Sequence, residues 1–138
     1  MTVGATKDPV RRWYEAWNTR AMEVSDATVG QDVVVHIENA DDIRGLADYR
    51  AFVLAFWDAF SDITLTIERM IAENDMVLVR SHFQATHSGA FMGLEPTGSA
   101  VAWRFHNIYR VEDGKWVEAW TLADSFSMMR QLGAIPNP

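Results

Sequence analysis

The sequence contains no cysteine, which excludes disulfides, thiolate nucleophiles and cysteine-ligated zinc or iron–sulfur sites. Basic residues are scarce, with 12 Lys and Arg against 19 Asp and Glu and a formal net charge of −7. This balance argues against a nucleic acid partner. No apolar run approaches the ~20 residues of a membrane helix, and residues 1–6 lack the apolar core of a signal peptide. We therefore expect a soluble, cytoplasmic protein with no nucleic acid or membrane partner.

The chain length and the number of aromatic residues predict one domain with a cavity. A chain of 138 residues buries one core, so residues 1–138 are expected to form a single domain. The 6 Trp, 7 Phe and 3 Tyr exceed what a core of this size needs. Some of these rings are therefore expected to line a cavity.

Two helices are predicted in the first half of the chain. The first begins at the Asp8-Pro9 pair, ends near Thr19 and presents an aromatic face made of Trp13, Tyr14 and Trp17. Residues 21–30 indicate a weaker helix or turn, and residues 33–37 a short buried strand. Apolar side chains at helical spacing predict the second helix over residues 46–60.

The second half is rich in strands. Alternation and β-branched residues predict strands at residues 63–68, 76–87, 101–111 and 115–122. Asp113-Gly114 joins the last two as a hairpin, and Asp124 is placed to cap a short terminal helix. This order predicts an α+β domain in which a curved, mixed and largely antiparallel sheet wraps around the N-terminal helices. Such a cone leaves a pocket between the two layers.

Motifs for common catalytic chemistry are missing. There is no Gly-x-Ser-x-Gly elbow, no phosphate loop and no Gly-x-Gly-x-x-Gly. The four histidines lack the local spacing of a metal site; they are His36, His82, His87 and His106. We expect neither a metal nor a cofactor. Acid–base chemistry by His, Asp or Glu remains, as does ligand binding without catalysis.

The strand over residues 101–111 has one apolar face. Alternation gives this face Trp103, Phe105, Asn107 and Tyr109, which predicts the wall of an apolar pocket around a single amide. The opposite face carries two arginines and is expected to be exposed or interfacial. On the next strand, alternation places Trp116 and Trp120 on the outer face, which suggests that a second subunit covers it.

Several stretches between Phe52 and Pro136 match a known pattern in order and spacing. They are residues 73–80, 86–93, 96–98, 107–111, 113–115, 118–120 with Asp124, and 131–133. On these stretches the sequence resembles the SnoaL-like polyketide cyclases of the nuclear transport factor 2-like superfamily.

The resemblance implies a cone-shaped α+β barrel with an apolar pocket, usually in a homodimer packed through the sheets. For the best-known members it implies a cofactor-free intramolecular aldol ring closure of an aromatic polyketide. An Asp on the last strand acts there as acid and base, and its position is held here by Thr121, with Asn107 as its polar neighbour. A threonine does not take up a proton at neutral pH as a carboxylate does.

Four residues are predicted to be catalytic. His36 would be the base if it aims into the cone, and would otherwise be a histidine held by hydrogen bonds. Asn107 would hold a carbonyl or enolate oxygen, and Thr121 a hydroxyl or a water. Asp124 is the carboxylate nearest to Thr121, although capping is the stronger interpretation for it. Glu38 shares a face with His36 but lies near a strand end, where solvent exposure is expected.

Six further residues are expected to contact substrate, namely Tyr14, Trp17, Trp57, His82, Trp103 and Phe105. His87 is expected to fix a loop by hydrogen bonds. We expect a cofactor-independent enzyme that moves a proton alpha to a carbonyl, leading to ring closure or isomerisation of a small apolar or polycyclic substrate. The alternatives are a hydroxylase- or epoxide-hydrolase-like enzyme and a binding protein without catalysis.

Overall fold

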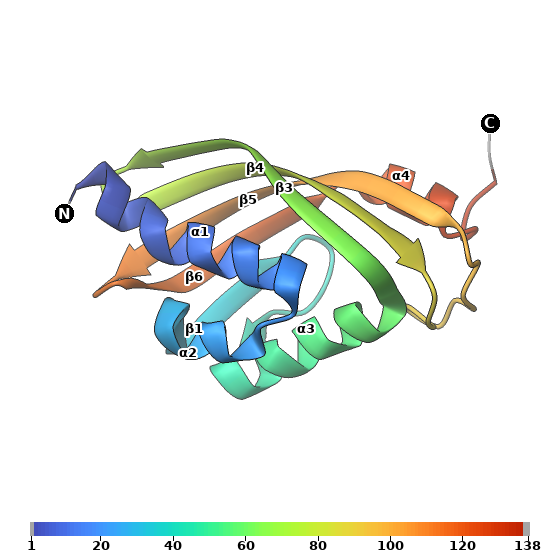
Figure 1. The fold of residues 1–138 in the computed structure, drawn as a ribbon, viewed down its shortest axis with the longest axis horizontal. Coiled ribbons are helices and arrows are strands. Elements are labelled where there is room, and N and C mark those ends of the chain that lie inside the picture. The colour runs from blue at the N-terminus through green and yellow to red at the C-terminus, as the bar shows by residue number, and fades with distance from the viewer. Residues whose placement is uncertain (1, 137–138) are drawn as a thin grey trace.

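The computed structural model describes residues 2–136. Its sheet has the strand order β2-β1-β6-β5-β4-β3. The strands are β1 (Val29–Ile37), β2 (Ile43–Arg44), β3 (Phe60–Glu73), β4 (Met76–His87), β5 (Ala100–Glu112) and β6 (Lys115–Ala123). Only β1 and β6 pair in parallel, and the other neighbours are antiparallel. The predicted α+β class with a curved, mixed sheet is confirmed (Figure 1).

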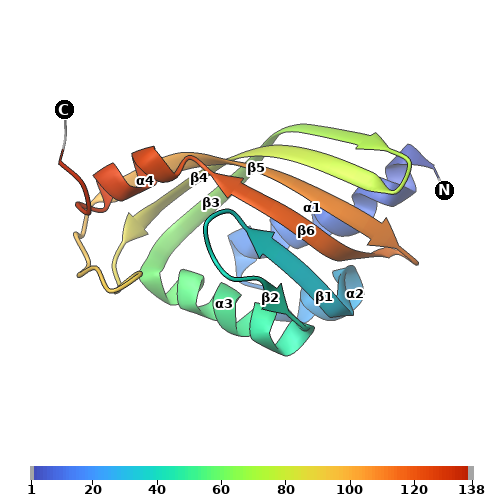
Figure 2. The ribbon, with the colours of Figure 1, turned by 180° about the vertical axis from the view of Figure 1, so that it is seen from behind.

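The helices lie mainly on one side of this sheet. They are α1 (Val3–Thr19), a 3₁₀ turn (Met22–Val24), α2 (Ser25–Thr28), α3 (Leu46–Ala59) and α4 (Ser125–Gln131). Figure 1 shows α1 and α3 on the same, concave side. Seen from behind in Figure 2, β6 runs beside β1, and α4 lies at the end of the sheet near the C-terminus. The cone is thus closed by helices on its inner side.

The first helix begins earlier than the sequence suggests. The Thr2 side chain accepts a hydrogen bond from the Ala5 N–H at 3.1 Å and caps α1, so the prediction of a start at Asp8-Pro9 is wrong. Pro9 lies inside the helix, where it has no N–H to donate to the carbonyl four residues earlier. The end near Thr19 is confirmed. Arg20 follows it and donates to the carbonyl oxygens of Trp57 and Phe60.

Tight turns fix the register of the long strands. Asp113 and Gly114 both have positive φ, 52° and 78°, as a two-residue hairpin with the twist of its strands requires. The β4 strand covers residues 76–87 as predicted. These hairpins bring residues of β4, β5 and β6 onto one inner wall.

A bulge changes the direction of one tryptophan. The β5–β6 register shifts between Arg110 and Val111, so that Arg110 pairs with Glu118 and Val111 with Trp116. The irregularity leaves Val117 outside the pairing and returns Trp116 to the inner face. Trp116 is 1% exposed, and the prediction that it lies on the outer face is wrong. Trp120 does lie on the outer face.

The outer face of the sheet carries a row of exposed apolar side chains. Register pairs Ile71 with Leu78, Leu78 with Ile108, and Ile108 with Trp120. All four side chains are exposed. We call them the outer apolar row.

Candidate functional site

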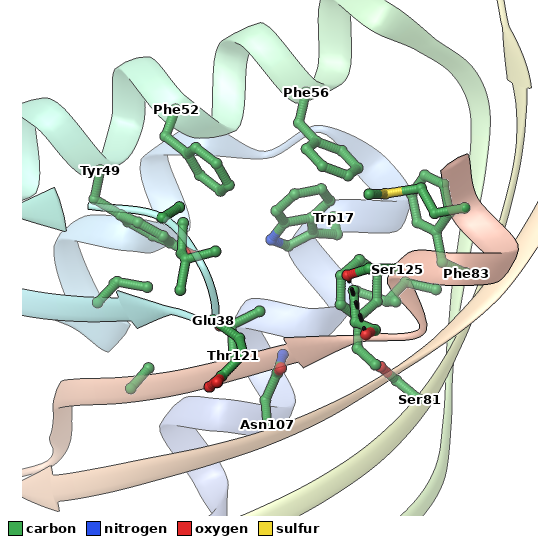
Figure 3. Close-up of a pocket in the computed structure, with 18 of the residues that line it drawn as sticks. Trp17, Glu38, Tyr49, Phe52, Phe56, Ser81, Phe83, Asn107, Thr121 and Ser125 are labelled. Atoms are coloured by element: carbon green, nitrogen blue, oxygen red, sulfur yellow. Dashed lines mark hydrogen bonds between the residues drawn. The ribbon is translucent and has the colours of Figure 1, made fainter. Parts of the chain in front are cut away.

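An apolar cavity of about 680 Å³ lies between α1, α3 and the inner face of the sheet. Its wall is rich in aromatic rings, those of Trp13, Tyr14, Trp17, Tyr49, Phe52, Phe56, Phe83, Phe91, Phe105, Tyr109 and Trp116. In Figure 3, rings of α3 and Trp17 face a wall with a few polar groups, among them Asn107 and Thr121. Volume and lining suit a ring-containing small molecule.

Three side chains form what we call the hydroxyl–amide cluster: Tyr14, Asn107 and Tyr109. The Asn107 Nδ2 donates to the Tyr14 hydroxyl and to the Tyr109 hydroxyl, both at 3.1 Å. The two phenol oxygens are 2.7 Å apart and share a hydrogen bond. All three residues are buried and line the cavity. The cluster joins α1 to β5 across the cone.

Burial sets the protonation of these phenols. It raises the pKa of Tyr14 above the ordinary value, and hydrogen bonds from Tyr109 and Asn107 oppose part of this rise. Burial also raises the pKa of Tyr109 well above the ordinary value. Both hydroxyls therefore remain protonated at neutral pH. They can donate hydrogen bonds but cannot serve as bases.

Asn107 and Thr121 lie opposite each other on β5 and β6. Both line the cavity. The resemblance places the family's acid–base Asp at Thr121, and the structure puts a side chain at that position on the cavity wall. Whether Asn107 and Thr121 act in catalysis stays a prediction.

Glu38 supplies the carboxylate that Thr121 does not. It follows the end of β1, and its N–H donates to the Thr121 carbonyl oxygen at 3.1 Å. Among the cavity-lining residues that the structure describes, Glu38 alone carries a carboxylate. Figure 3 shows it beside Thr121. The side chain is exposed, as the sequence suggested, and the residue is nevertheless part of the cavity lining.

His36 lies outside the cavity, so the prediction that it aims into the cone is wrong. Its Nε2 is 2.7 Å from Glu118 and its Nδ1 is 3.0 Å from Asp42. The ring stacks on Trp120, with the centroids 5.4 Å apart. Strand alternation turns His36 outward because Val35 and Ile37 take the inner positions. It cannot be the base for a ligand in this cavity.

Three predicted pocket residues do not line the cavity. His82 is on the outer side of β4, where its strand neighbours are Thr66 and Arg104. Trp57 and Trp103 are buried in the core at 5% and 3% exposure. Their rings pack against other rings, Trp57 on Trp17 and Trp103 on Phe83, which places them behind the wall.

Tyr14, Trp17 and Phe105 line the cavity, and their contact with a substrate stays a prediction. The Asp124 side chain accepts from the Ser127 N–H at 3.1 Å and caps α4. Asp124 lies outside the lining, because its carboxylate is held at the helix end. Sequence reasoning missed Ser81 as a wall residue, although its strand parity with Phe83 could have indicated it.

His87 fixes the loop after β4, as expected. It is fully buried, and its Nδ1 accepts from the Thr97 N–H at 3.1 Å. Farther along the same loop, Phe91 and Met92 line the cavity. Gly89 lies against the end of α3, where a Cβ would overlap the Asp58 carbonyl oxygen. Loop and helix are therefore in close contact next to the cavity lining.

Residues 2–136 contain neither the side-chain cluster of a metal site nor a membrane-spanning helix. That range holds no group of three or more His, Asp or Glu side chains arranged to bind a metal ion. Nor does any helix within it have the length and apolar character needed to span a membrane.

Comparison with known proteins assigns this chain to a family. The profile of the SnoaL-like polyketide cyclases matches residues 7–132. A search of curated proteins finds no significant match. AclR from Streptomyces galilaeus, a proposed hydroxylase, is 29% identical with a TM-score of 0.87, over 99% of this chain and 86% of AclR.

Two further structures are similar. IdmH from Streptomyces antibioticus, a proposed polyketide cyclase, is 30% identical with a TM-score of 0.78, over 93% of this chain and 98% of IdmH. TsrD from Streptomyces laurentii, at 21% identity and a TM-score of 0.87, shares the fold over 98% of this chain and 99% of TsrD. With the family profile covering most of its length, this chain belongs to the SnoaL-like polyketide cyclases.

Proposed function

We propose that this protein is a cofactor-independent cytoplasmic enzyme that moves a proton alpha to a carbonyl group. Its substrate is a small, largely apolar and ring-containing intermediate, and the proton transfer leads to ring closure or isomerisation. The observation that carries this proposal is one carboxylate, Glu38, in the lining of a largely apolar cavity that is rich in aromatic rings and also holds a buried group of phenol and amide side chains.

Glu38 is the proposed base. Its carboxylate removes a proton from the carbon next to the substrate carbonyl, and the C–H electron pair forms the enolate. In a ring closure, the enolate carbon attacks a second carbonyl within the substrate, and the carboxyl group returns the proton to the resulting alkoxide oxygen. In an isomerisation, the carboxyl group returns the proton to a different carbon of the enolate system. The aromatic wall excludes water and aligns the rings.

Hydrogen–deuterium exchange at carbon tests this reaction without the natural substrate. The probe is 1-tetralone in D₂O, and NMR follows loss of the signal of the hydrogens next to its carbonyl. We expect the protein to accelerate exchange and Glu38→Gln to lower the rate by about 10²-fold or more, the usual range for a general base. Glu23→Gln is the matched control, because Glu23 is exposed and outside the cavity.

Two results would refute this function. One is exchange no faster than in buffer while 1-tetralone binds, which would favour a ligand carrier. The other is an equal rate for Glu38→Gln and the unchanged protein, which would remove Glu38 from the mechanism.

A hydroxylase-type reaction is the second candidate. It is supported by the similarity to AclR over 99% of this chain and by a threonine at the position where the family's cyclases carry Asp. Such an enzyme would consume dioxygen when given a reduced, electron-rich polycyclic phenol. An oxygen electrode measures this directly, and the proton-transfer function predicts no uptake above buffer.

A further inference from the structure

The short helix α4 forms part of the cavity wall without belonging to the core. Its residues Ser125, Met128 and Met129 line the cavity, and Figure 3 shows Ser125 on this wall. None of residues 125–131, all of which the structure describes, is buried. A helix of 7 residues is too short to be stable by itself in water. The position of α4 therefore depends on its contacts with the sheet.

Next to α4, one edge of β5 has no strand beside it. β6 ends at Ala123, and the Asp124 N–H adds one further hydrogen bond, to the Arg104 carbonyl oxygen at 2.9 Å. β5 itself begins at Ala100. Because alternate residues of an antiparallel strand direct their N–H and C=O to the same edge, Ala102 presents both groups on the edge that Arg104 uses. Without α4, both groups of Ala102 would lack a partner.

The side-chain amide of Gln131 pairs with Ala102 as a strand would. Its Oε1 accepts from the Ala102 N–H at 2.8 Å, and its Nε2 donates to the Ala102 carbonyl oxygen at 2.6 Å. The Nε2 also donates to the Ser127 hydroxyl at 2.8 Å. Apart from bonds to residues 123 and 124, the described part of the chain contains no other hydrogen bond between α4 and the sheet.

The two residues after Gln131 complete this attachment. Leu132 is 3% exposed and belongs to the hydrophobic core. Gly133 has a φ of 81°, the left-handed conformation that ends many helices and favours glycine. Residues 131–133 thus hold the C-terminal end of α4, and the chain at Asp124 holds its other end. The side chains that face the cavity lie between these two points.

We infer that Gln131 is a positioning residue for the cavity, and that α4 is a movable wall which small molecules pass when the pairing with Ala102 breaks. Opening takes one buried side chain out of the core, that of Leu132, so the closed state predominates. Met128 and Met129 suit such a wall, because their flexible, unbranched side chains repack around ligands of different shape. The inference requires a molecule in the cavity but not the proposed proton transfer.

Amide hydrogen exchange, followed by NMR, tests the pairing in the protein without ligand. Gln131→Met keeps the length of the side chain and removes both hydrogen bonds to Ala102. The Ala102 N–H should then exchange about tenfold faster or more, as the loss of two hydrogen bonds implies. Ser127→Ala is the matched control, because it removes the third bond of Gln131 and keeps the two to Ala102. Its Ala102 N–H should exchange at nearly the rate of the unchanged protein.

Binding kinetics test the passage. The probe is prodan, a neutral naphthalene ketone whose fluorescence changes in an apolar cavity, and stopped-flow measurements give its association and dissociation rate constants. Gln131→Met should raise both rate constants by about tenfold, because opening requires fewer hydrogen bonds to break. The Kd should change little, since the wall is closed both before and after binding. Ser127→Ala should leave both rate constants nearly unchanged, and circular dichroism checks that each variant is folded.

Four results would overturn the inference. Equal Ala102 exchange in Gln131→Met and the unchanged protein would mean that Gln131 does not hold this edge. Equal rate constants for prodan would place the passage elsewhere, such as at the loop after β4. Faster dissociation alone, with weaker binding, would make α4 a fixed wall. Failure of the unchanged protein to bind prodan would mean that no such molecule passes α4. Each result is independent of exchange at carbon, so the proposed function is tested separately.

Discussion

Asn107 and Thr121 face each other across β5 and β6, with both side chains on the wall of the cavity. Resemblance to the cyclases puts their acid–base Asp at Thr121. The residue at the position of this Asp therefore lies on the cavity wall beside Asn107, but as a threonine it has no ionisable carboxyl group. In the function proposed above, the carboxylate is that of Glu38, whose backbone N–H donates a hydrogen bond to the Thr121 carbonyl oxygen.

Restoring a carboxylate at this position should add activity. In Thr121→Asp the new group lies beside Asn107, and we expect 1-tetralone exchange to rise by about 10²-fold. The gain should grow with pH as the new carboxyl ionises. Thr121→Asn is the matched neutral control, and equal rates in the two variants would contradict the prediction. The rate is measured by NMR across pH 4 to 8.

The buried bond between Trp13 and Tyr49 should stabilise the fold. The Trp13 Nε1 donates to the Tyr49 hydroxyl at 2.9 Å, and both residues are buried. Tyr49→Phe leaves a buried indole N–H without an acceptor, so the free energy of unfolding should fall by about 1–3 kcal/mol. Urea denaturation measures it. In a double-mutant cycle with Trp13→Phe, additive losses would show that the hydrogen bond contributes nothing.

The environment of His36 predicts a pH-dependent stability. Hydrogen bonds to Glu118 and then to Asp42 raise the pKa of His36 in the folded state above its ordinary value. The stabilisation is complete below the unfolded pKa of about 6.5. It is lost as pH rises through the higher folded value. Since the imidazole is 31% exposed, the contribution should be below about 1 kcal/mol.

His36→Phe tests this, because it keeps a ring against Trp120. The unfolding free energy of the unchanged protein should exceed that of the variant most at about pH 6, and the difference should shrink towards pH 8. Urea denaturation of both proteins gives the unfolding free energy at each pH. Groups that titrate in the same way in both proteins cancel in the difference between the two values. A difference that is constant with pH would refute the role of protonation.

The outer apolar row is where we expect a second copy of the chain to bind. Ile108 lies in the middle of the row, between Leu78 and Trp120. Ile108→Glu would bury a charge in such an interface and should convert a homodimer into a monomer. Light scattering after size-exclusion chromatography gives the mass. Leu54→Glu is the control, since Leu54 is 48% exposed on α3, and a monomeric unchanged protein would disprove the expected dimer.

The strands β4, β5 and β6 could be predicted from sequence because their periodicity and turns agree, whereas β3 extends over residues 60–73 and beyond the predicted 63–68 at both ends. The limits of β4 matched at both ends, and Asp113-Gly114 marked its hairpin correctly. The start of α1 could not be predicted, because the Asp8-Pro9 pair is a stronger helix-start signal in the sequence than the threonine at position 2 that caps the helix. Trp116 was misplaced because strict alternation fails at a bulge.

The candidate site was harder to predict than the fold. Alternation along a strand shows which residues share a face with His36, but it does not show which of the two faces lies toward the helices. The expectation that His36 faces the cavity is wrong for this reason. The place of Glu38 near a strand end predicts solvent exposure, and the sequence does not show that this strand end also borders the cavity. Asn107 was recognised as a polar group in an aromatic wall. Its phenol partner Tyr14 comes from a helix 93 residues away, a contact that no local pattern contains.

The loop after β4 is held by hydrogen bonds at both of its ends. Its start is anchored to the Ala59 carbonyl oxygen by the N–H groups of Ser88 and Gly89, and its end to His87 by Thr97. The residues between these anchors reach the cavity without belonging to a regular strand. Changes in this segment alone can therefore alter the size and chemistry of this part of the cavity lining, while the sheet and the hydroxyl–amide cluster stay intact. Relatives with one shared interior can in this way admit different molecules.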